Sequence, residues 1–507
     1  MAFMLIEAET FDNLGGWVID TQCTEAMGSP YIMAHGLGHP VADATTTFSL
    51  PESGHWHVFA RTRDWTCAWG RGAPAGRFQL LIDGRALDPE FGTNGGDWAW
   101  QPGGAVSMEA APHRLALRDL TGFNGRCDAI YLTTDPQDVP PDDATACREF
   151  RRRRAARVVE EDPVEYDLLV CGGGYAGLCA AVSAKWLRMK VLLVQDRGVC
   201  GGCNSSEVRV WLGGCTNVGE YPMLGNVSRL LGPICGRPPM RKTAEIFEDA
   251  RKVQLLDPGQ NLLLHESVFE VEMDASNPRR IAAVVTQGVR TGRLTRRRAK
   301  QFLDATGDAL LARRSGCEVR YGREERSAFD ESLAPERADR MVMGHSTLWE
   351  VGRRESPVAF PDIDWGIEFN DANGLPRVNC CWDWETGQRR DQVLEIERIR
   401  DYGLMTAIAN WSWLKNRAAC REAYSHHELE WVSPIGGKRE SYRVVGDHVM
   451  SEKDLVRHAV FEDGTAAVTW NIDLHYPDPE NEDRFGEAFQ SCAYHHGIGR
   501  IAQVPYR

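Results

Sequence analysis

The spacing of apolar residues changes once along the chain. From Leu5 to about Leu132, apolar and polar residues alternate over short segments such as HWHVFARTRDW, RFQLLIDGR and HRLALRDL, with Gly, Pro, Asp and Asn clusters between them. A period of two residues is typical of strands that bury one face. We therefore expect an all-β sandwich over 1–135, with a hairpin tip at Asp83-Gly84.

A segment rich in proline and charge follows the predicted sandwich. It has few strand-forming residues, so we expect a linker over 136–163, with a short helix near 148–157. Beyond it, strands alternate with longer helical stretches, which predicts an α/β domain over 164–507.

The stretch 166–194 has the pattern of a nucleotide-binding βαβ unit. YDLLV predicts a buried strand, Gly172-x-Gly174-x-x-Gly177 a turn, LCAAVSAKWLRM a helix and VLLV a second strand. Small residues let the backbone approach a pyrophosphate, and the free N–H groups of a helix N-terminus attract its charge. Because all four pieces occur in order, we favour a dinucleotide site over a glycine-rich turn that binds nothing.

The end of the second predicted strand departs from the usual pattern. An acid that binds ribose is expected there, but the strand ends in Gln195, with Asp196 after it. Either side chain can bind ribose hydroxyls, whereas only Asp196 would repel a 2′-phosphate. We therefore expect an adenine dinucleotide without that phosphate.

Composition excludes several classes of protein. A net charge of −14 argues against a nucleic-acid surface, and no apolar run approaches the length of about 20 residues that spans a membrane. The N-terminus MAFMLIEAETF has neither a basic leader nor a small-residue cleavage site, so we expect a cytoplasmic protein. Fifteen scattered cysteines predict reduced thiols. We interpret the arginine runs 151–154 and 296–298 as solvated charge rather than binding tails.

The segment RAKQFLDATGDALLARRSGCEVRYGRE predicts a second strand–turn–helix unit. With the first unit, it resembles the FAD-dependent oxidoreductases of the glutathione-reductase-type fold, in which an Ala-Thr-Gly ends a strand beside the dinucleotide. Five further motifs resemble motifs of a bacterial subgroup of these oxidoreductases that is associated with carbohydrate metabolism. In chain order they are GGCNSSEVRVW, WDWETGQRRD, IANWSWLKN, GGKRESYRVVGDHVMSEKDL and WNIDLHYP. The resemblance covers most of 166–507.

The resemblance implies an α/β fold with a Rossmann-like FAD-binding domain and an inserted substrate or cap region over about 327–494. Its cofactor would be FAD. The FAD-binding residues that it implies are Gly172, Gly174, Tyr175, Ala176, Gly177, Gln195, Asp196, Arg197, Gly201, Gly202, Asn204, Ser205, Ala305, Thr306, Gly307 and Asp308. In the family, the stretch matching IAQVPYR leads into a further strand and helix that face the flavin. The resemblance thus implies that these 507 residues are a C-terminally truncated form or are completed by another chain.

Cys200 and Cys203 follow the second predicted strand and allow two interpretations. Flavin disulfide reductases carry a redox-active cysteine pair near the first βαβ unit. Those enzymes, however, place the pair on a helix with wider spacing. The subgroup resembled here has a glycine pair, so we favour close backbone approach to the flavin at Gly201 and Gly202 and keep a redox disulfide as the alternative.

Catalytic candidates come from the predicted cap region. Oxidation of a hydroxyl-bearing carbon needs a base for the O–H proton and donors that hold the oxygen. We favour His475 as the base, with Asp473 beside it, over a purely structural His–Asp hydrogen bond. Arg439 and Arg443 would share a face if helical, and could serve as a substrate or flavin clamp or as ion-pair partners of Glu440. We therefore predict His475, Asp473 and Arg439 as the catalytic residues.

The ends of the predicted sandwich, LIEAETF and GRCDAIYL, resemble carbohydrate-binding modules. In such modules an early Glu and a late Asp bind a structural calcium ion, and the matching positions are Glu7, Glu9 and Asp128. From the residues alone we predict no metal site, and His426-His427 and His495-His496 lack ligand-like neighbours. Four tryptophans could stack on sugars, although packing is the more usual role. They are Trp65, Trp69, Trp98 and Trp100.

The sequence therefore predicts an FAD-dependent oxidoreductase that acts on a small hydroxyl-bearing substrate, a sugar or glycoside, with hydride transfer to flavin. The alternative is a carbohydrate-binding protein whose flavin domain is structural or inactive. Neither hypothesis involves nucleic acid or a membrane, and both leave the oligomeric state open.

Overall fold

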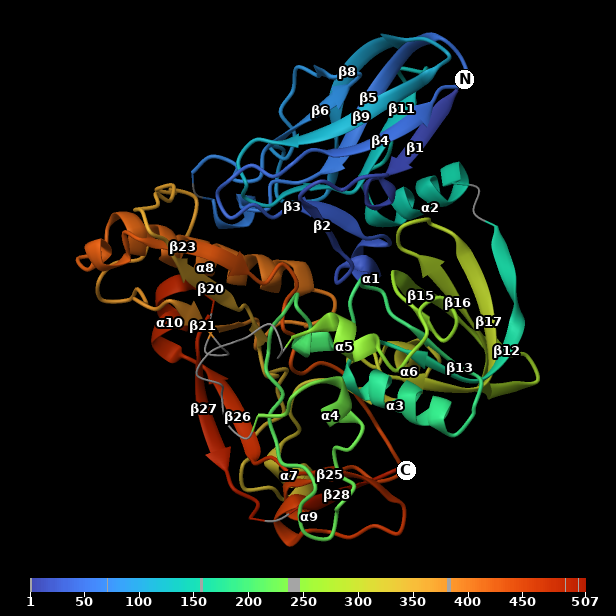
Figure 1. Ribbon diagram of the computed structural model, residues 1–507, viewed down its shortest axis with the longest axis vertical. Helices are drawn as coiled ribbons and strands as arrows, with labels where there is room; N and C mark the ends of the chain where they lie inside the picture. The colour runs from blue at the N-terminus through green and yellow to red at the C-terminus, as the bar shows by residue number, and fades with distance from the viewer. Residues whose placement is uncertain are drawn as a thin grey trace.

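The computed structural model describes residues 2–70, 72–155, 158–235, 247–380, 384–487, 489–499 and 501–507. An all-β region forms one end of the molecule, and a mixed region of sheets and helices forms the other (Figure 1). Within the described residues, none of the helices has the length and apolar character that crossing a bilayer requires.

The N-terminal region is an antiparallel β-sandwich, as predicted. Its two larger sheets have the strand orders β1-β11-β5-β8 and β4-β9-β6-β7, and a small sheet has the order β10-β3-β2. The elements are β1 (Phe3–Glu7), η1 (Ala8–Thr10), β2 (Trp17–Asp20), α1 (Thr24–Met27), β3 (Tyr31–Ala34), β4 (Ala44–Ser49), β5 (Gly54–Thr62), η2 (Cys67–Trp69), β6 (Phe78–Ile82), β7 (Arg85–Ala86), β8 (Ala99–Met108), β9 (Pro112–Asp119), β10 (Gly125–Cys127) and β11 (Ala129–Thr133). Trp56, Phe78 and Leu117 bury the inner faces of the two larger sheets in one core.

The turn between β6 and β7 confirms the predicted hairpin tip. Ile82 pairs with Arg85, and Asp83 and Gly84 have φ angles of 50° and 79°. Two successive positive φ angles match the twist of the flanking strands, which is why Asp-Gly is favoured there.

Helix α2 (Ala144–Ala155) follows the sandwich, where a short helix was predicted. The two arginine runs, 151–154 and 296–298, were expected to be solvated, and this expectation is wrong for one arginine in each run. Arg151 on α2 is 7% exposed and Arg297 is 8% exposed, because each is paired with two carboxylates. Those partners are Glu7 and Asp128 for the first arginine, and Asp162 and Glu266 for the second.

A six-stranded sheet of order β14-β13-β12-β17-β16-β15 forms the centre of the mixed region. Its strands are β12 (Val159–Cys171), β13 (Val191–Val194), β14 (Leu262–Leu263), β15 (Glu266–Asp274), β16 (Asn277–Gly288) and β17 (Leu294–Asp304). The first four in that order run parallel, whereas β16 pairs antiparallel with both neighbours. Helix α3 (Tyr175–Trp186) connects β12 to β13 and completes the predicted βαβ unit. Strand β12 begins at Val159, inside the segment 136–163 that was expected to be a linker.

The remaining elements form small sheets and helices around this centre. They are η3 (Gly202–Asn204), α4 (Ser228–Leu231), α5 (Asp249–Val253), α6 (Leu310–Arg314), β18 (Val319–Arg320), α7 (Arg326–Phe329), β19 (His345–Ser346), β20 (Trp349–Arg353), β21 (Asn379–Cys380), β22 (Glu385–Thr386), α8 (Ile396–Asn416), η5 (Arg421–Tyr424), β23 (His427–Val432), β24 (Arg443–Val444), α9 (Glu452–Arg457), β25 (Gly464–Val468), β26 (Ile472–Pro477), α10 (Pro479–Phe485), β27 (Ser491–His496) and β28 (Ala502–Pro505).

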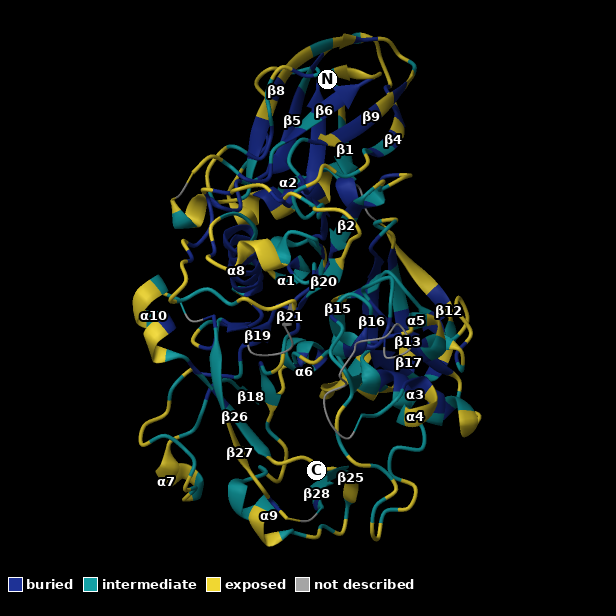
Figure 2. Cartoon of the chain, turned by 60° about the vertical axis from the view of Figure 1, so that its left-hand side comes forward, coloured by how far each residue is buried: buried dark blue, intermediate teal, exposed yellow. Residues whose placement is uncertain are grey.

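Helix α8 joins the sandwich to the rest of the chain. Nearly all of its length is buried (Figure 2), and it shares one apolar core with Trp65 and Phe123 of the sandwich. Near its start, Arg126 of β10 pairs with Asp401 at 2.6 Å, and Arg400 pairs with Asp20 at 2.5 Å. The sandwich is therefore docked through an apolar core bordered by buried ion pairs.

Candidate functional site

A cavity of about 520 Å³ lies at the carboxyl ends of β12, β13 and β17. Three short segments that directly follow these strands line it: 172–174, 195–197 and 305–308. The carboxyl edge of a parallel sheet is where the connecting loops leave a crevice, so the sheet topology creates this site.

The turn from β12 to α3 presents backbone rather than side chains to the cavity. Gly172 has a φ of 103°, and a Cβ there would lie 2.4 Å from the carbonyl oxygen of Ala305. Gly174 caps α3 without a side-chain hydrogen bond, and a Cβ on it would meet no protein atom within 4 Å. The first N–H groups of α3 are thus available to an anionic ligand beside Gly174.

Gln195 supports this turn from the end of β13. Its Oε1 accepts a hydrogen bond from the N–H of Gly173 at 2.6 Å, and its Nε2 donates to the carbonyl of Val199 at 3.2 Å. Because both ends of the amide are engaged within the protein, the side chain braces the glycine turn. Asp196 lines the cavity next to it.

The turn after β17 is held by its own carboxylates. Asp304 accepts hydrogen bonds from the N–H and the hydroxyl of Thr306 at 3.0 and 2.7 Å. Asp308 binds Lys438 Nζ at 2.6 Å and the hydroxyl of Ser441 at 2.7 Å. Asp308 therefore links the parallel sheet to the segment that carries the predicted arginines.

Most residues predicted to bind FAD lie at this cavity. Fourteen of the sixteen line it: Gly172, Gly174, Tyr175, Ala176, Gln195, Asp196, Arg197, Gly201, Gly202, Asn204, Ala305, Thr306, Gly307 and Asp308. Gly177 instead packs against the carbonyl of Gly172, where a Cβ would lie 1.9 Å from the oxygen. Ser205 is fully buried.

The three predicted catalytic residues lie together, but only Arg439 lines the cavity. His475 is 4% exposed, and its Nδ1 lies 2.9 Å from both Arg439 Nη1 and Glu385 Oε1. Its Nε2 lies 3.0 Å from Asp473 Oδ1, and Arg439 also pairs directly with Glu385. His475 therefore lies behind Arg439, between two carboxylates.

The segment 436–442 is not helical, so Arg439 and Arg443 do not share a helix face. Arg443 begins β24 and pairs with Glu440 at 2.9 Å and Glu324 at 3.3 Å. Of the two alternatives, the ion-pair network describes Arg443, whereas Arg439 pairs with Glu385 and lines the cavity.

Cys200 and Cys203 are both free thiols in the structure. Cys203 lines the cavity, and its Sγ donates to the carbonyl of Lys438 at 3.3 Å. Burial raises the pKa of Cys200 to about 12, and burial also raises the pKa of Cys203. A raised pKa lowers the thiolate fraction on which disulfide exchange depends.

Part of the cavity wall comes from the sandwich, which the sequence analysis did not predict. Its lining residues there are Thr21, Gln22, Thr24 and Glu25. The side-chain amide of Gln22 exchanges two hydrogen bonds with the backbone of Gly436, of 3.1 and 2.8 Å. Glu25 pairs with Arg313 at 2.7 Å. No local motif marks these residues, because docking alone brings them to the cavity.

The four tryptophans, for which packing was the favoured role, all contact other parts of the chain. Trp65 is fully buried against Trp365, and Trp100 is 6% exposed. Trp98 donates its Nε1–H to Glu397 at 3.0 Å. Trp69 lies against Tyr402. Trp65 and Trp100 are buried, whereas Trp69 and Trp98 are half-buried, so sugar stacking at the latter two stays a prediction.

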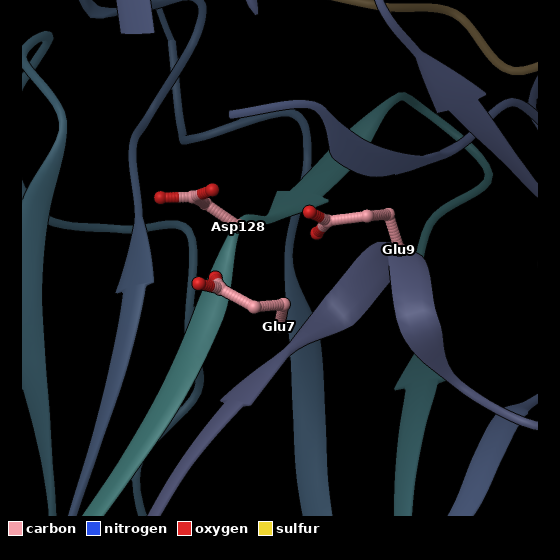
Figure 3. Close-up of side chains that lie close together, drawn as sticks. All are labelled: Glu7, Glu9 and Asp128. Atoms are coloured by element: carbon pink, nitrogen blue, oxygen red, sulfur yellow. The ribbon is translucent and has the colours of Figure 1, made fainter. Parts of the chain in front are cut away.

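The three residues matched to a calcium site lie together in the sandwich. Ligand oxygens of Glu7, Glu9 and Asp128 are all within 4.8 Å of one another (Figure 3). Arg151 also contacts this group.

Comparisons with known proteins give a family match and slight structural likenesses. The profile of the family described as FAD dependent oxidoreductase matches residues 167–507. No curated protein sequence matches the chain. Among solved structures, a family 35 carbohydrate binding module from Clostridium thermocellum is 13% identical, with a TM-score of 0.22, and covers 27% of this chain and 100% of that one. A CBM35 from Paenibacillus barcinonensis is 16% identical, with a TM-score of 0.21, and the match covers 26% of this chain and 99% of that one. An open-conformation flavocytochrome c3 fumarate reductase is 18% identical, with a TM-score of 0.25, and the match covers 34% of this chain and 43% of that one.

Proposed function

Because the chain belongs to the family of FAD-dependent oxidoreductases, we propose that it oxidises a hydroxyl group of a carbohydrate or glycoside. The protein is a flavoenzyme, and FAD is its cofactor. The substrate would lie between the glycine turn and a polar wall made by Gln22, Lys438 and Arg439.

The residues at the cavity fit FAD. The uncapped N-terminus of α3 and the open space beside Gly174 would take the pyrophosphate, and Asp196 would take a ribose. A cavity of about 520 Å³ lies within the usual range for ligand sites. When bound, FAD supplies the acceptor for the two electrons that leave the substrate carbon.

The observation that carries the proposal is a pair of held cations at the cavity wall. Lys438 is fixed by Asp308 at 2.6 Å, and Arg439 is fixed by Glu385 and His475. Their remaining N–H donors can bind the oxygen of a hydroxyl group and stabilise the negative charge that develops on it as its proton passes to water in the cavity. Such donors suit an oxygen-rich substrate.

We assign His475 a positioning role instead of the predicted role of proton acceptor. It does not line the cavity, whereas Arg439, which it contacts through Nδ1, does. With Glu385 on the same side, it holds the guanidinium in one orientation.

The test is anaerobic mixing of the FAD-loaded protein with a panel of sugars and glycosides, followed by flavin absorbance. We expect at least one compound to bleach the flavin. Arg439→Lys keeps a charge for Glu385 but loses the planar donors, so bleaching should slow roughly tenfold to a hundredfold with FAD content unchanged.

Arg443→Lys is the matched control, because Arg443 pairs with glutamates and does not line the cavity. It should bleach at the normal rate. A panel that leaves the flavin oxidised throughout would refute the proposed substrate class.

A further inference from the structure

The acidic cluster of the sandwich has the residue types of a calcium site. Glu7 ends β1, Glu9 follows in η1, and Asp128 lies between β10 and β11 (Figure 3). Hard cations of this kind need six to eight oxygen ligands that are free to turn toward the ion. The hydrogen bonds of these carboxylates therefore decide whether the ion fits.

Two arginines already bind the oxygens of the cluster. Asp128 Oδ2 accepts from Arg61 at 2.6 Å and from Arg151 at 2.9 Å. Its Oδ1 accepts from Ser29 at 2.9 Å and from Arg151 at 3.3 Å. Arg151 also contacts the carboxylate of Glu7, so its guanidinium lies between two of the three acids.

Two of the three carboxylates of the cluster are neutralised without a metal ion. Arg61 and Arg151 neutralise two carboxylates, and Glu9 is the third. Glu9 is 2% exposed, and its Oε2 lacks a hydrogen-bond partner among the described residues. The two guanidinium groups therefore already occupy oxygens of Asp128 and Glu7 that a calcium ion would need as ligands.

We propose that the guanidinium of Arg151 takes the place of the calcium ion and makes the sandwich independent of calcium. The side chain comes from α2, outside the sandwich strands, and Cys147, one turn earlier on the same helix, is also buried. The charge that ties β1 to Asp128 is therefore supplied by the segment that leads to the flavin region. A divalent ion would need to displace it, because two guanidinium groups would repel the ion.

The experiment measures thermal unfolding of the full chain in EDTA and in calcium chloride, with terbium luminescence as a probe of ion binding. The native protein should have the same midpoint in both solutions and should bind no terbium in the sandwich. Arg151→Met should unfold at a lower temperature, gain back a few degrees in calcium, and bind one terbium ion per chain.

Arg152→Met is the control, because Arg152 lies on the exposed face of the same helix and pairs with Glu149 alone among the described residues. It should show neither the lower midpoint nor the calcium response. A native protein that loses stability in EDTA would overturn the proposal, as would an Arg151→Met protein that calcium does not stabilise.

A second variant tests the proposal if Arg151→Met does not fold. Glu9→Gln removes one carboxylate from the cluster and leaves the ion pairs of Arg61 and Arg151 in place, so the native midpoint should stay unchanged in EDTA and in calcium. A calcium site would lose a ligand in this variant, and a lower midpoint that appears only in calcium would overturn the proposal.

Discussion

The acidic cluster of the sandwich and the cavity beside the glycine turn both gather charged side chains from distant parts of the chain. In the cluster, Arg61 and Arg151 are buried on carboxylates and do not line the cavity. At the cavity, Lys438 and Arg439 are also paired with carboxylates, yet both lie on open space. An ion pair with a carboxylate therefore does not by itself decide whether a cationic side chain can bind a ligand. Open space beside the ion pair decides it, because a ligand can reach the remaining N–H donors only there.

The two regions also depend on each other. Gln22 and Glu25 of the sandwich line the cavity, and they are held there by Gly436 and Arg313. Damage to the docking of the sandwich should therefore reach the cavity, whereas damage to the glycine turn should leave the sandwich intact. Four substitutions test this asymmetry.

The largest effect should come from Arg126→Met. Arg126 is fully buried and binds Asp401 at 2.6 Å and Glu397 at 2.8 Å. Removing its charge leaves buried carboxylates with fewer partners, so we expect a loss of about 3 kcal/mol in the free energy of unfolding. Urea unfolding followed by tryptophan fluorescence measures it, and FAD content should fall as well.

Arg118→Met is the control for that loss. Arg118 pairs with Asp43 at 3.3 Å on the surface of the sandwich, where an ion pair contributes about 0–1 kcal/mol. Equal unfolding midpoints for the two variants would show that the buried ion pairs do not hold the sandwich in place.

The second effect should come from Gly174→Val. A side chain at Gly174 meets no protein atom within 4 Å, so the fold should be unchanged, but the side chain would occupy the space of the pyrophosphate. We expect FAD content to fall by at least about tenfold, with the same unfolding midpoint when both proteins are compared free of FAD. Gly54→Val is the matched control, since a Cβ there meets only Thr134 at 3.9 Å. Full FAD occupancy in the Gly174 variant would show that this turn does not bind the cofactor.

The third effect is a pH dependence of the docking. Burial alone would raise the pKa of Glu397, but the charges of Arg63, Arg126 and Arg400 outweigh it and lower that pKa to about 2 from 4.5. A lowered pKa stabilises the fold above pH 4.5, and this contribution is lost as the pH falls through about 2.

Between these limits, the free energy of unfolding should fall by up to about 1.4 kcal/mol per pH unit from this group. Urea midpoints measured between neutral and acid pH should therefore drop more steeply for the native protein than for Glu397→Gln, which cannot take up the proton. Parallel profiles would contradict this account of the interface.

The smallest effect should come from Gln22→Ala. It removes the two hydrogen bonds to Gly436, which together contribute about 1 kcal/mol at a partly exposed site. We expect a rise in KM of about fivefold for a compound that bleaches the flavin, with FAD content unchanged. Gln137→Ala, at an exposed loop position of the same region, is the control and should leave KM as it was.

Local patterns in the sequence were enough to predict the elements that build the cavity beside the glycine turn. The apolar run before Gly172, the glycine spacing and the VLLV strand predicted the βαβ unit, and the alternation over 1–135 predicted the sandwich. These features depend on neighbours a few residues apart, whose backbone geometry and periodicity are the same in every fold that uses them. They could therefore be inferred without knowing where distant segments lie.

The roles of individual side chains were decided by tertiary structure. Trp65 packs on Trp365, Gln22 reaches the cavity, His475 lies behind Arg439, and Arg151 enters the acidic cluster. Each role depends on a contact between segments far apart in the chain, and no local period encodes such a contact. Burial then determines the chemistry, because a charge removed from water must find a partner, and only the folded chain brings that partner to it.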